Sequence, residues 1–383
     1  MAEMTAIERV SAVLAGERPD RPPVSFWHHF PPSTASGQAA VDAHLQHLRR
    51  FNLDFLKVMN DNPYPTLRVV RTAADLRDVP VLRGDEDGFG AQLALLRALS
   101  AELSGKLLMV TTVFNSWAVL RRIVTPPVDD RHHPPTLHGR PTPMDVRLSA
   151  LLAEDRSAVG MALDAIAMSQ ANFARRCLEA GADGIFLSVR DDWVDTPGNG
   201  LSTYDEMVRL GDGQILTASR GGRFNILHVC GVPRDFDGFA AYPVQAISWA
   251  DRAAGPAIGE VIERIKPVVC GGVDNLATLP NGTPASVAAE VRDAITQAGD
   301  RPMIVAPGCT YDPDVVPPHN LDGIVQAVRS VGSPAWPGYL HAPLRRSSFR
   351  AADVWKSEHG TDVNHPQARR DPTPPHRPGH STL

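Results

Sequence analysis

A histidine and a cysteine two residues apart, His228 and Cys230, are the side chains of this chain best suited to chemistry. They lie in the apolar run 224–230, which ends at a glycine and predicts a short β-strand. Side chains two apart in a strand share a face, so His228 and Cys230 should converge. A second thiol, Cys309, ends another apolar run beside Gly308. If these runs are neighbours, one imidazole and two thiolates form a ligand set suited to zinc, with a fourth position left open.

The same residues also have a purely structural interpretation. Cysteine is among the most buried residue types, and a strand histidine often only forms hydrogen bonds in the core. The three residues are far apart in the sequence, and no CxxC pair supports them. Spacing alone leaves both interpretations open. The glycines at the two strand ends favour a metal site, because an α/β barrel places its chemistry where strands open into loops.

Short apolar segments alternate with amphipathic helical segments along most of the chain. Eight segments are predicted to be strands: 24–27, 55–59, 107–113, 184–189, 224–230, 246–249, 267–270 and 303–306. Helices are predicted over 5–16, 38–51, 148–180, 203–210, 258–265, 284–298 and 320–331. This alternation is typical of parallel βαβ units and predicts a single (β/α)8 TIM barrel over residues 1–332. No GxGxxG follows an early strand, so a dinucleotide-binding fold is not supported.

Length and composition limit the class of protein. The chain has 383 residues, 43% hydrophobic and 21% charged, which suits one barrel-sized domain. Its net charge of −5 is too mild to indicate nucleic acid or an anionic membrane as a partner, and no apolar stretch could span a membrane. Four scattered cysteines and no signal segment predict a cytoplasmic protein with free thiols. Residues 333–383, rich in Pro, His and Arg, predict a disordered or surface-draped tail.

Five segments, taken together and in order, make the chain resemble the uroporphyrinogen decarboxylase superfamily. They are 9–24, 227–231, 246–251, 271–274 and 307–320. The resemblance covers about residues 5–331 and implies a (β/α)8 barrel with its site at the carboxyl ends of the strands. The superfamily has two main kinds of member. Decarboxylases of porphyrin biosynthesis use no metal, whereas zinc-dependent methyltransferases move a methyl group from a methylated corrinoid protein to a thiol.

The motif residues favour the methyltransferase branch. The decarboxylases carry an arginine-rich loop after the first strand, whereas the corresponding residues 26–32 of this chain include no arginine. The decarboxylases also have a histidine at the position of Cys309. The zinc motif of the methyltransferases, His-x-Cys and then a Gly-Cys turn, is matched by His228, Cys230 and Cys309. The resemblance therefore implies Zn²⁺ as cofactor and a small-molecule thiol, bound by zinc, as acceptor. The donor would be a methylated corrinoid (methylcobalamin) or another activated donor. Because this chain contains no corrinoid-binding module, a corrinoid would be carried by a separate protein.

Further polar and aromatic residues follow the predicted strands and are candidates for substrate contact or proton transfer. Asp61 stands where the decarboxylases keep their catalytic aspartate. Strand alternation would point only one of His28 and His29 into the site. We take Asp61 and His28 as the candidate catalytic residues. The candidate substrate-binding residues are Tyr64, Asn115, Trp117 and Asp274. Each has a structural alternative as a turn former, a helix cap or a large core residue.

Two other functions stay open at this point. The first is decarboxylation of a uroporphyrinogen-type substrate, which would require an arginine cluster at the site; the residues that could form it are Arg121, Arg122, Arg190 and Arg220. The second is a barrel whose zinc is structural, which would require a closed site with four protein ligands. The sequence does not distinguish a monomer from a homodimer.

Overall fold

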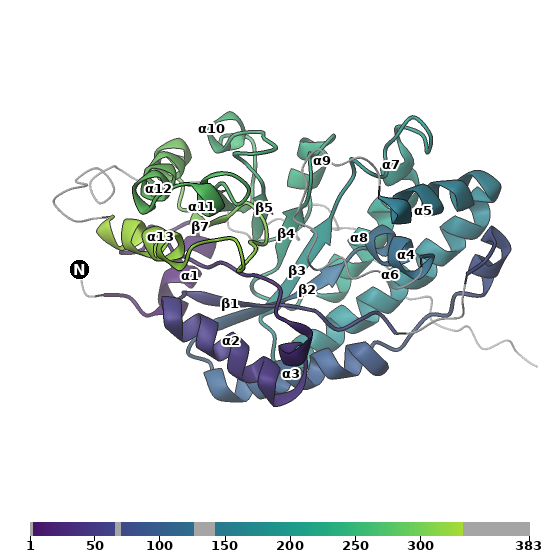
Figure 1. The fold of residues 1–383 in the computed structure, drawn as a ribbon, viewed down its shortest axis with the longest axis horizontal. Helices are drawn as coiled ribbons and strands as arrows, with labels where there is room; N and C mark the ends of the chain where they lie inside the picture. Colours follow the sequence, from purple (N-terminus) through teal and green to yellow (C-terminus); the bar gives the residue numbers. More distant parts are fainter. Residues whose placement is uncertain (1–2, 66–69, 126–141, 332–383) are drawn as a thin grey trace, which may run out of the picture.

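A computed structural model describes residues 3–65, 70–125 and 142–331, so the predicted tail lies outside the described residues (Figure 1). Its centre is one parallel sheet in which the strands follow one another in chain order. The strands are β1 (Phe55–Val58), β2 (Leu108–Phe114), β3 (Gly184–Val189), β4 (Ile226–Val229), β5 (Ala246–Trp249), β6 (Val268–Val273) and β7 (Ile304–Pro307). Each strand was predicted to within a few residues. The parallel α/β fold is therefore confirmed.

Helices connect successive strands and lie along the outside of the sheet (Figure 1). Those before β3 are α1 (Ala6–Leu14), α2 (Gly37–Phe51), α3 (Asp87–Leu103), α4 (Ser116–Ile123), α5 (Pro143–Glu154) and α6 (Arg156–Glu179). Those after β3 are α7 (Thr203–Met207), α8 (Arg209–Ala218), α9 (Phe236–Ala240), α10 (Ile258–Val261), α11 (Thr278–Asn281), α12 (Pro284–Ala298) and α13 (Pro318–Ser330). Two 3₁₀ helices cover Pro32–Thr34 and Ala73–Asp78. None of the described helices is both long and apolar enough to cross a bilayer.

The first predicted strand, 24–27, forms only a single bridge. Val24 pairs in parallel with Val305 of β7, and the Asp54 amide just before β1 donates to the Val24 carbonyl at 2.9 Å. The segment thus lies between β7 and β1, at the place of the missing strand. The prolines at 22 and 23 have no N–H to give to a ladder, which limits regular pairing here. The described residues therefore form seven strands and not the predicted eight.

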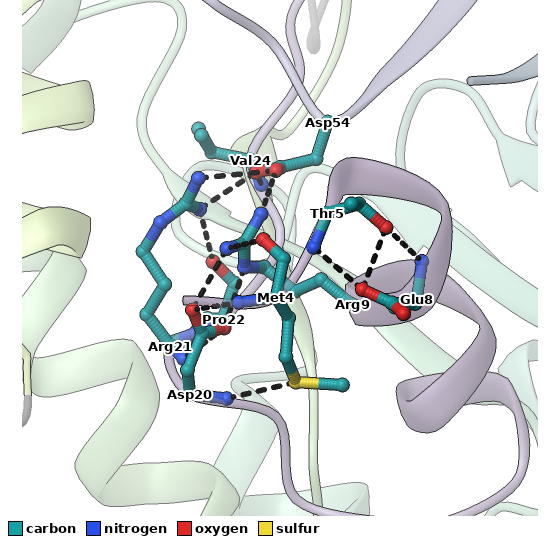
Figure 2. Close-up of polar contacts among 9 residues, drawn as sticks. All are labelled: Met4, Thr5, Glu8, Arg9, Asp20, Arg21, Pro22, Val24 and Asp54. Carbon is teal, nitrogen blue, oxygen red and sulfur yellow. Dashed lines mark hydrogen bonds and ion pairs between the residues drawn. The ribbon is translucent and has the colours of Figure 1, made fainter. Parts of the chain in front are cut away.

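A buried charge network fastens this bridging segment to the start of β1 (Figure 2). Asp54 accepts from Arg9 Nη1 at 2.6 Å, from Arg21 Nη1 at 2.7 Å and from the Val24 amide at 2.8 Å. Arg9 also donates through Nε to Asp20 at 2.7 Å. One carboxylate thus joins α1, the segment before Val24 and β1.

Side chains along the strands alternate between the interior of the sheet and the helical layer. In β1, Phe55 belongs to the inner apolar cluster, while Leu56 and Val58 pack in the outer cluster against helices. In β4 and β7, Ile226 and Ile304 belong to the inner cluster. This alternation sets which residues at the carboxyl ends of the strands can meet.

Candidate metal centre

The three predicted metal ligands follow inner-facing positions of β4 and β7. His228 and Cys230 are two and four residues beyond the inner residue Ile226, and Cys309 follows the end of β7. A Cβ on Gly308 would lie 2.6 Å from the Ala250 backbone, so only glycine lets this turn pass close to β5. Backbone geometry, rather than sequence proximity, brings the three side chains together.

The structure places one ligand atom from each of the three within 4.8 Å of the others. Cys309 Sγ lies 3.3 Å from His228 Nε2. His228 is buried, whereas the two cysteines are half-buried beside a pocket. Among the residues that the structure describes, no other group of His, Cys, Asp or Glu meets the same criterion for a metal site.

This donor set fits zinc in chemistry and in spacing. Tetrahedral zinc, with bonds of about 2.0–2.3 Å to nitrogen and sulfur, sets neighbouring ligand atoms about 3.5 Å apart. The 3.3 Å separation of Cys309 Sγ and His228 Nε2 is close to that value. Three protein ligands beside a pocket match a catalytic site, since a structural site uses four.

The second ring nitrogen of His228 also has a partner, which fixes the imidazole. His228 Nδ1 lies 3.3 Å from Ser248 Oγ, and Ser248 is its register partner on β5. If Nδ1 carries the proton and donates to Ser248, Nε2 keeps its lone pair for a metal. Phe186 of β3 stacks on the imidazole, with ring centroids 5.1 Å apart. The sequence analysis missed both Ser248 and Phe186.

The two thiols differ in their pKa values. The pKa of Cys230 is lowered well below its ordinary value, chiefly by a hydrogen bond from Cys309. A hydrogen bond from His228 and the charge of Arg190 lower it further, although burial opposes them. The same hydrogen bond raises the pKa of Cys309. Arg190 Nη1 is 4.0 Å from Cys230 Sγ. Of the two thiols, Cys230 is therefore the one that loses its proton more readily.

Arg190 is held beside Cys230 by a fork of hydrogen bonds. Its Nε and Nη2 donate to the two carboxylate oxygens of Asp192 at 2.5 and 2.8 Å. Gly231 has φ of 77°, and a Cβ there would lie 2.7 Å from both Arg190 and Asp192. A larger residue after Cys230 would therefore displace the arginine.

A cavity of about 250 Å³ opens beside the three candidate ligands. Its wall is largely apolar and aromatic. Besides the ligands, the lining residues are His29, Phe30, Pro31, Pro32, Lys57, Met59, Asn60, Thr112, Phe114, Arg122, Phe186, Ser188, Thr310, Tyr311, Asp312, Pro313 and Asp314. Arg122 is the one lining arginine among the described residues, so the arginine cluster required for a porphyrin decarboxylase is not found there.

Lys57 is a further residue that the sequence analysis missed. It follows the inner residue Phe55 by two positions on β1, so it points into the sheet interior and lines the cavity. Only 5% of the residue is exposed. Burial lowers the pKa of Lys57 to about 7, and the negative charges of Asp61 and Cys309 partly oppose this.

His29, rather than His28, lines the cavity and pairs with Asp61. His29 Nδ1 is 2.5 Å from Asp61 Oδ1, and the Phe30 amide donates to Asp61 Oδ2 at 3.2 Å. Burial raises the pKa of Asp61, but the hydrogen bonds from His29 and from the Phe30 amide outweigh burial and lower the pKa below its usual value. His28 instead turns toward α2, where its ring lies 5.1 Å from that of His47. A catalytic role for His28 stays a prediction, but His29 is the one of the two that lines the cavity, because the segment after Trp27 is not a strand and strict alternation does not hold there.

The four predicted substrate-binding residues are not among those that line the cavity. Tyr64 packs edge-on to Phe89, and Trp117 is a 3% exposed core residue. Asp274 Oδ1 accepts from the amides of Leu276 and Ala277, which is the behaviour of a turn former. Asn115 caps α4 by accepting from the Ala118 amide. Each of these four residues therefore lies where a core residue, a helix cap or a turn former would lie.

Asn115 also belongs to a buried network around Asp212. Tyr204 and Tyr242 donate to Asp212 Oδ2 at 2.5 and 2.9 Å, and Asn115 donates to the Tyr204 hydroxyl at 3.2 Å. Asp212 is fully buried, and its Oδ1 has no hydrogen-bond partner in the structure. Burial raises the pKa of Asp212 to about 7, despite the tyrosine hydrogen bonds.

The substitution Asp212→Asn should remove a pH dependence of stability. The folded pKa of about 7 exceeds the unfolded value of about 3.9, so the native state holds a proton that the unfolded state loses between these values. The protonated Asp212 contributes its whole stabilisation to the free energy of unfolding below about pH 4. This stabilisation is lost as the pH rises to about 7, at up to about 1.4 kcal/mol per pH unit. The variant should therefore gain stability relative to wild type across this window. Urea unfolding at several pH values measures this gain.

The exposed substitution Asp42→Asn is the matched control for this experiment and should give a curve parallel to that of the wild type. A constant difference between Asp212→Asn and wild type from pH 4 to 8 would contradict an Asp212 proton held by the native state.

Fold and site together define a parallel α/β protein with a candidate metal centre at the carboxyl ends of its strands. The family model of uroporphyrinogen decarboxylase (URO-D) matches residues 57–331, and the chain belongs to this family. A search of curated proteins found no match.

Two solved structures can be compared with this chain. A methyltransferase from Methanosarcina mazei matches with a TM-score of 0.62 and 16% identity, over 86% of this chain and 99% of that chain. A B12-independent methionine synthase from Shewanella sp. W3-18-1, solved with selenomethionine, has a TM-score of 0.49 and 11% identity, over 81% of this chain and 98% of that chain. At 16% identity, the match to the Methanosarcina mazei structure bears on the fold alone.

Proposed function

We propose that this protein is a zinc-dependent methyltransferase that moves a methyl group from a methylated corrinoid, or another activated donor, to a thiol. The observation that carries the proposal is the meeting of His228, Cys230 and Cys309 beside a cavity. The methyltransferase named among the fold neighbours is consistent with it. A small-molecule thiol is the substrate, and a separate corrinoid-carrying protein is the partner if the donor is a corrinoid.

His228, Cys230 and Cys309 are the residues that would hold zinc. Zinc bound there would lower the pKa of a substrate thiol and keep its sulfur nucleophilic. Ser248 would hold the His228 ring in the tautomer that leaves Nε2 free. Phe186 packs on the same ring and limits its rotation.

Four other lining residues, His29, Phe30, Phe114 and Met59, serve two further tasks. His29, whose Nδ1 pairs with Asp61, can present its other ring nitrogen to accept the thiol proton. The apolar residues Phe30, Phe114 and Met59 exclude water from the reacting atoms. In the transfer, a sulfur lone pair forms the new S–CH₃ bond. The bond between the methyl group and its donor breaks, and that electron pair stays with the donor.

The alternatives find less support among the described residues. A porphyrin-type decarboxylase requires several cations for its carboxylates, and one arginine, Arg122, lines the cavity. A structural zinc requires a fourth protein ligand, and the candidate group contains three.

Metal analysis combined with a methyl-transfer assay tests the proposal. Purified protein should contain one equivalent of zinc. With CD₃-labelled methylcobalamin and a panel of simple thiols, mass spectrometry should detect a CD₃-thioether. Metal-stripped protein should be inactive until zinc is restored. If zinc-loaded protein forms no methylated thiol with methylcobalamin or other methyl donors, or if stripped protein is equally active, the proposed function is wrong.

A further inference from the structure

Lys57 carries a buried amine in the cavity, and the mechanism above gives it no task. Its Nζ lies 2.8 Å from Met59 Sδ and within 4.8 and 5.7 Å of the ring centroids of Phe186 and Trp27. These contacts can hold an ammonium group in place, but aromatic rings and a thioether do not neutralise its charge. An ammonium group without a counter-ion is costly in such a site, which is why burial lowers the pKa of Lys57 to about 7, and an anion that entered the cavity would stabilise the ammonium form.

The carboxylate best placed to neutralise Lys57 is already engaged. Asp61 accepts from His29 Nδ1 at 2.5 Å through one oxygen and from the Phe30 amide at 3.2 Å through the other. Within the described part of the chain, Lys57 forms no ion pair within 4.0 Å, and its Nζ hydrogen bond goes to sulfur. The ammonium group therefore remains available to a negative charge that enters the cavity.

Charge balance at the metal centre indicates what that negative charge is. Two cysteine thiolates and a neutral imidazole would offset the charge of a divalent cation. The metal-loaded centre without substrate would therefore be neutral overall. An incoming thiolate would add one negative charge to a largely apolar cavity, where an unpaired charge is costly. Lys57 lines the same cavity as His228, Cys230 and Cys309, and Phe186 contacts both the Lys57 ammonium and the His228 ring.

We propose that Lys57 is the counter-charge for the substrate thiolate, so that the cavity binds the thiol in its anionic form. The proposal deepens the function proposed above and rests on it, because it presupposes a metal centre at the three ligands. It adds that affinity for the anionic sulfur depends on a residue that does not bind the metal. A Lys57 that serves only to pack against Trp27 and Phe186 would not distinguish an anionic ligand from a neutral one.

Ligand binding to the cobalt-substituted protein separates these two roles. Co²⁺ loading of wild type, Lys57→Met and Lys57→Arg gives a visible spectrum that changes when an exogenous ligand binds. Each protein is titrated with 2-mercaptoethanol, which binds as a thiolate, and with imidazole, which binds as a neutral molecule. Methionine keeps the length of the side chain without its charge, and arginine keeps the charge.

Lys57→Met should weaken 2-mercaptoethanol binding by about 10–100-fold, since an opposite charge that lines the same cavity is removed. Imidazole binding and cobalt content should stay as in wild type, and Lys57→Arg should retain most of the thiol affinity. Unchanged thiol affinity in Lys57→Met, or an equal loss for both ligands, would overturn the proposal. Lys57→Gln serves as a second neutral variant if Lys57→Met does not fold. A wild-type protein that binds no metal would instead overturn the proposed function itself.

Discussion

Replacing Cys309 with alanine is expected to abolish both metal binding and methyl transfer. Only three side chains form the candidate ligand group, so the variant would keep two, and two ligands cannot hold zinc against a chelator. The loss of affinity should exceed the roughly 10–100-fold that changes in outer-shell partners cause. Metal content after dialysis against a chelator measures the effect, and His228→Ala should behave in the same way.

Cys177→Ala is the matched control, because this cysteine is fully buried in α6 and outside the ligand group. It should keep one equivalent of zinc and full activity. A Cys309→Ala protein that retains zinc as the wild type does would show that Cys309 is not a ligand. A metal-free Cys309→Ala protein with normal methyl transfer would remove zinc from the mechanism.

Local sequence patterns were sufficient for most of the sheet and for the candidate ligands. Seven strands are short apolar runs bounded by glycine, proline or polar residues, and their burial on both faces makes such runs distinctive. His228 and Cys230 could be paired because alternation along one strand is a local property. Cys309 could be added only on the condition that its strand lies near that of His228, because its position depends on strand order, and the family resemblance supported that condition.

The partners of these ligands could not be predicted, because they depend on register between strands. Ser248 reaches His228 because the two are opposite each other on β4 and β5, and Phe186 reaches the same ring from β3. Lys57 carried a recognisable feature, since it is one charged residue within the buried segment 55–59. Its inward direction follows from Phe55 two positions earlier, which becomes clear only once the inner cluster is known.

Loops and helix ends account for most of the differences between prediction and structure. The predicted helix 148–180 is two helices, because Asp155 leaves helical geometry with φ of −153° and caps α6 by accepting from the Ala158 amide. Alternation could not decide which of His28 and His29 lines the cavity, because the segment after Trp27 is not a strand. Trp117 was assigned to substrate because it follows a strand, but it lies in a helix that turns it into the core.

Removing the charge of Asp54 by Asp54→Asn is expected to cost about 3–5 kcal/mol of unfolding free energy, the range for breaking a buried ion pair from one side. Arg9 and Arg21 both donate to this carboxylate, and at most 3% of the Arg9 and 11% of the Arg21 side chain is exposed (Figure 2). Asparagine has a similar shape, so the loss would measure the two guanidinium charges left without their shared partner. The shift of the urea midpoint measures the cost, provided that the m value, the slope of unfolding free energy against urea concentration, is unchanged.

Asp322→Asn is the matched control, since Asp322 pairs with Arg50 at the surface, where their side chains are 32% and 52% exposed. Such a pair contributes about 0–1 kcal/mol. The same substitution should therefore have a much larger effect at Asp54, and hydrogen exchange should show its local origin. The amides of Val24 and Ser25, bonded to Asp54 and Val305, should lose protection first. Equal costs at the two positions would show that the network does not fasten the bridging segment between β7 and β1.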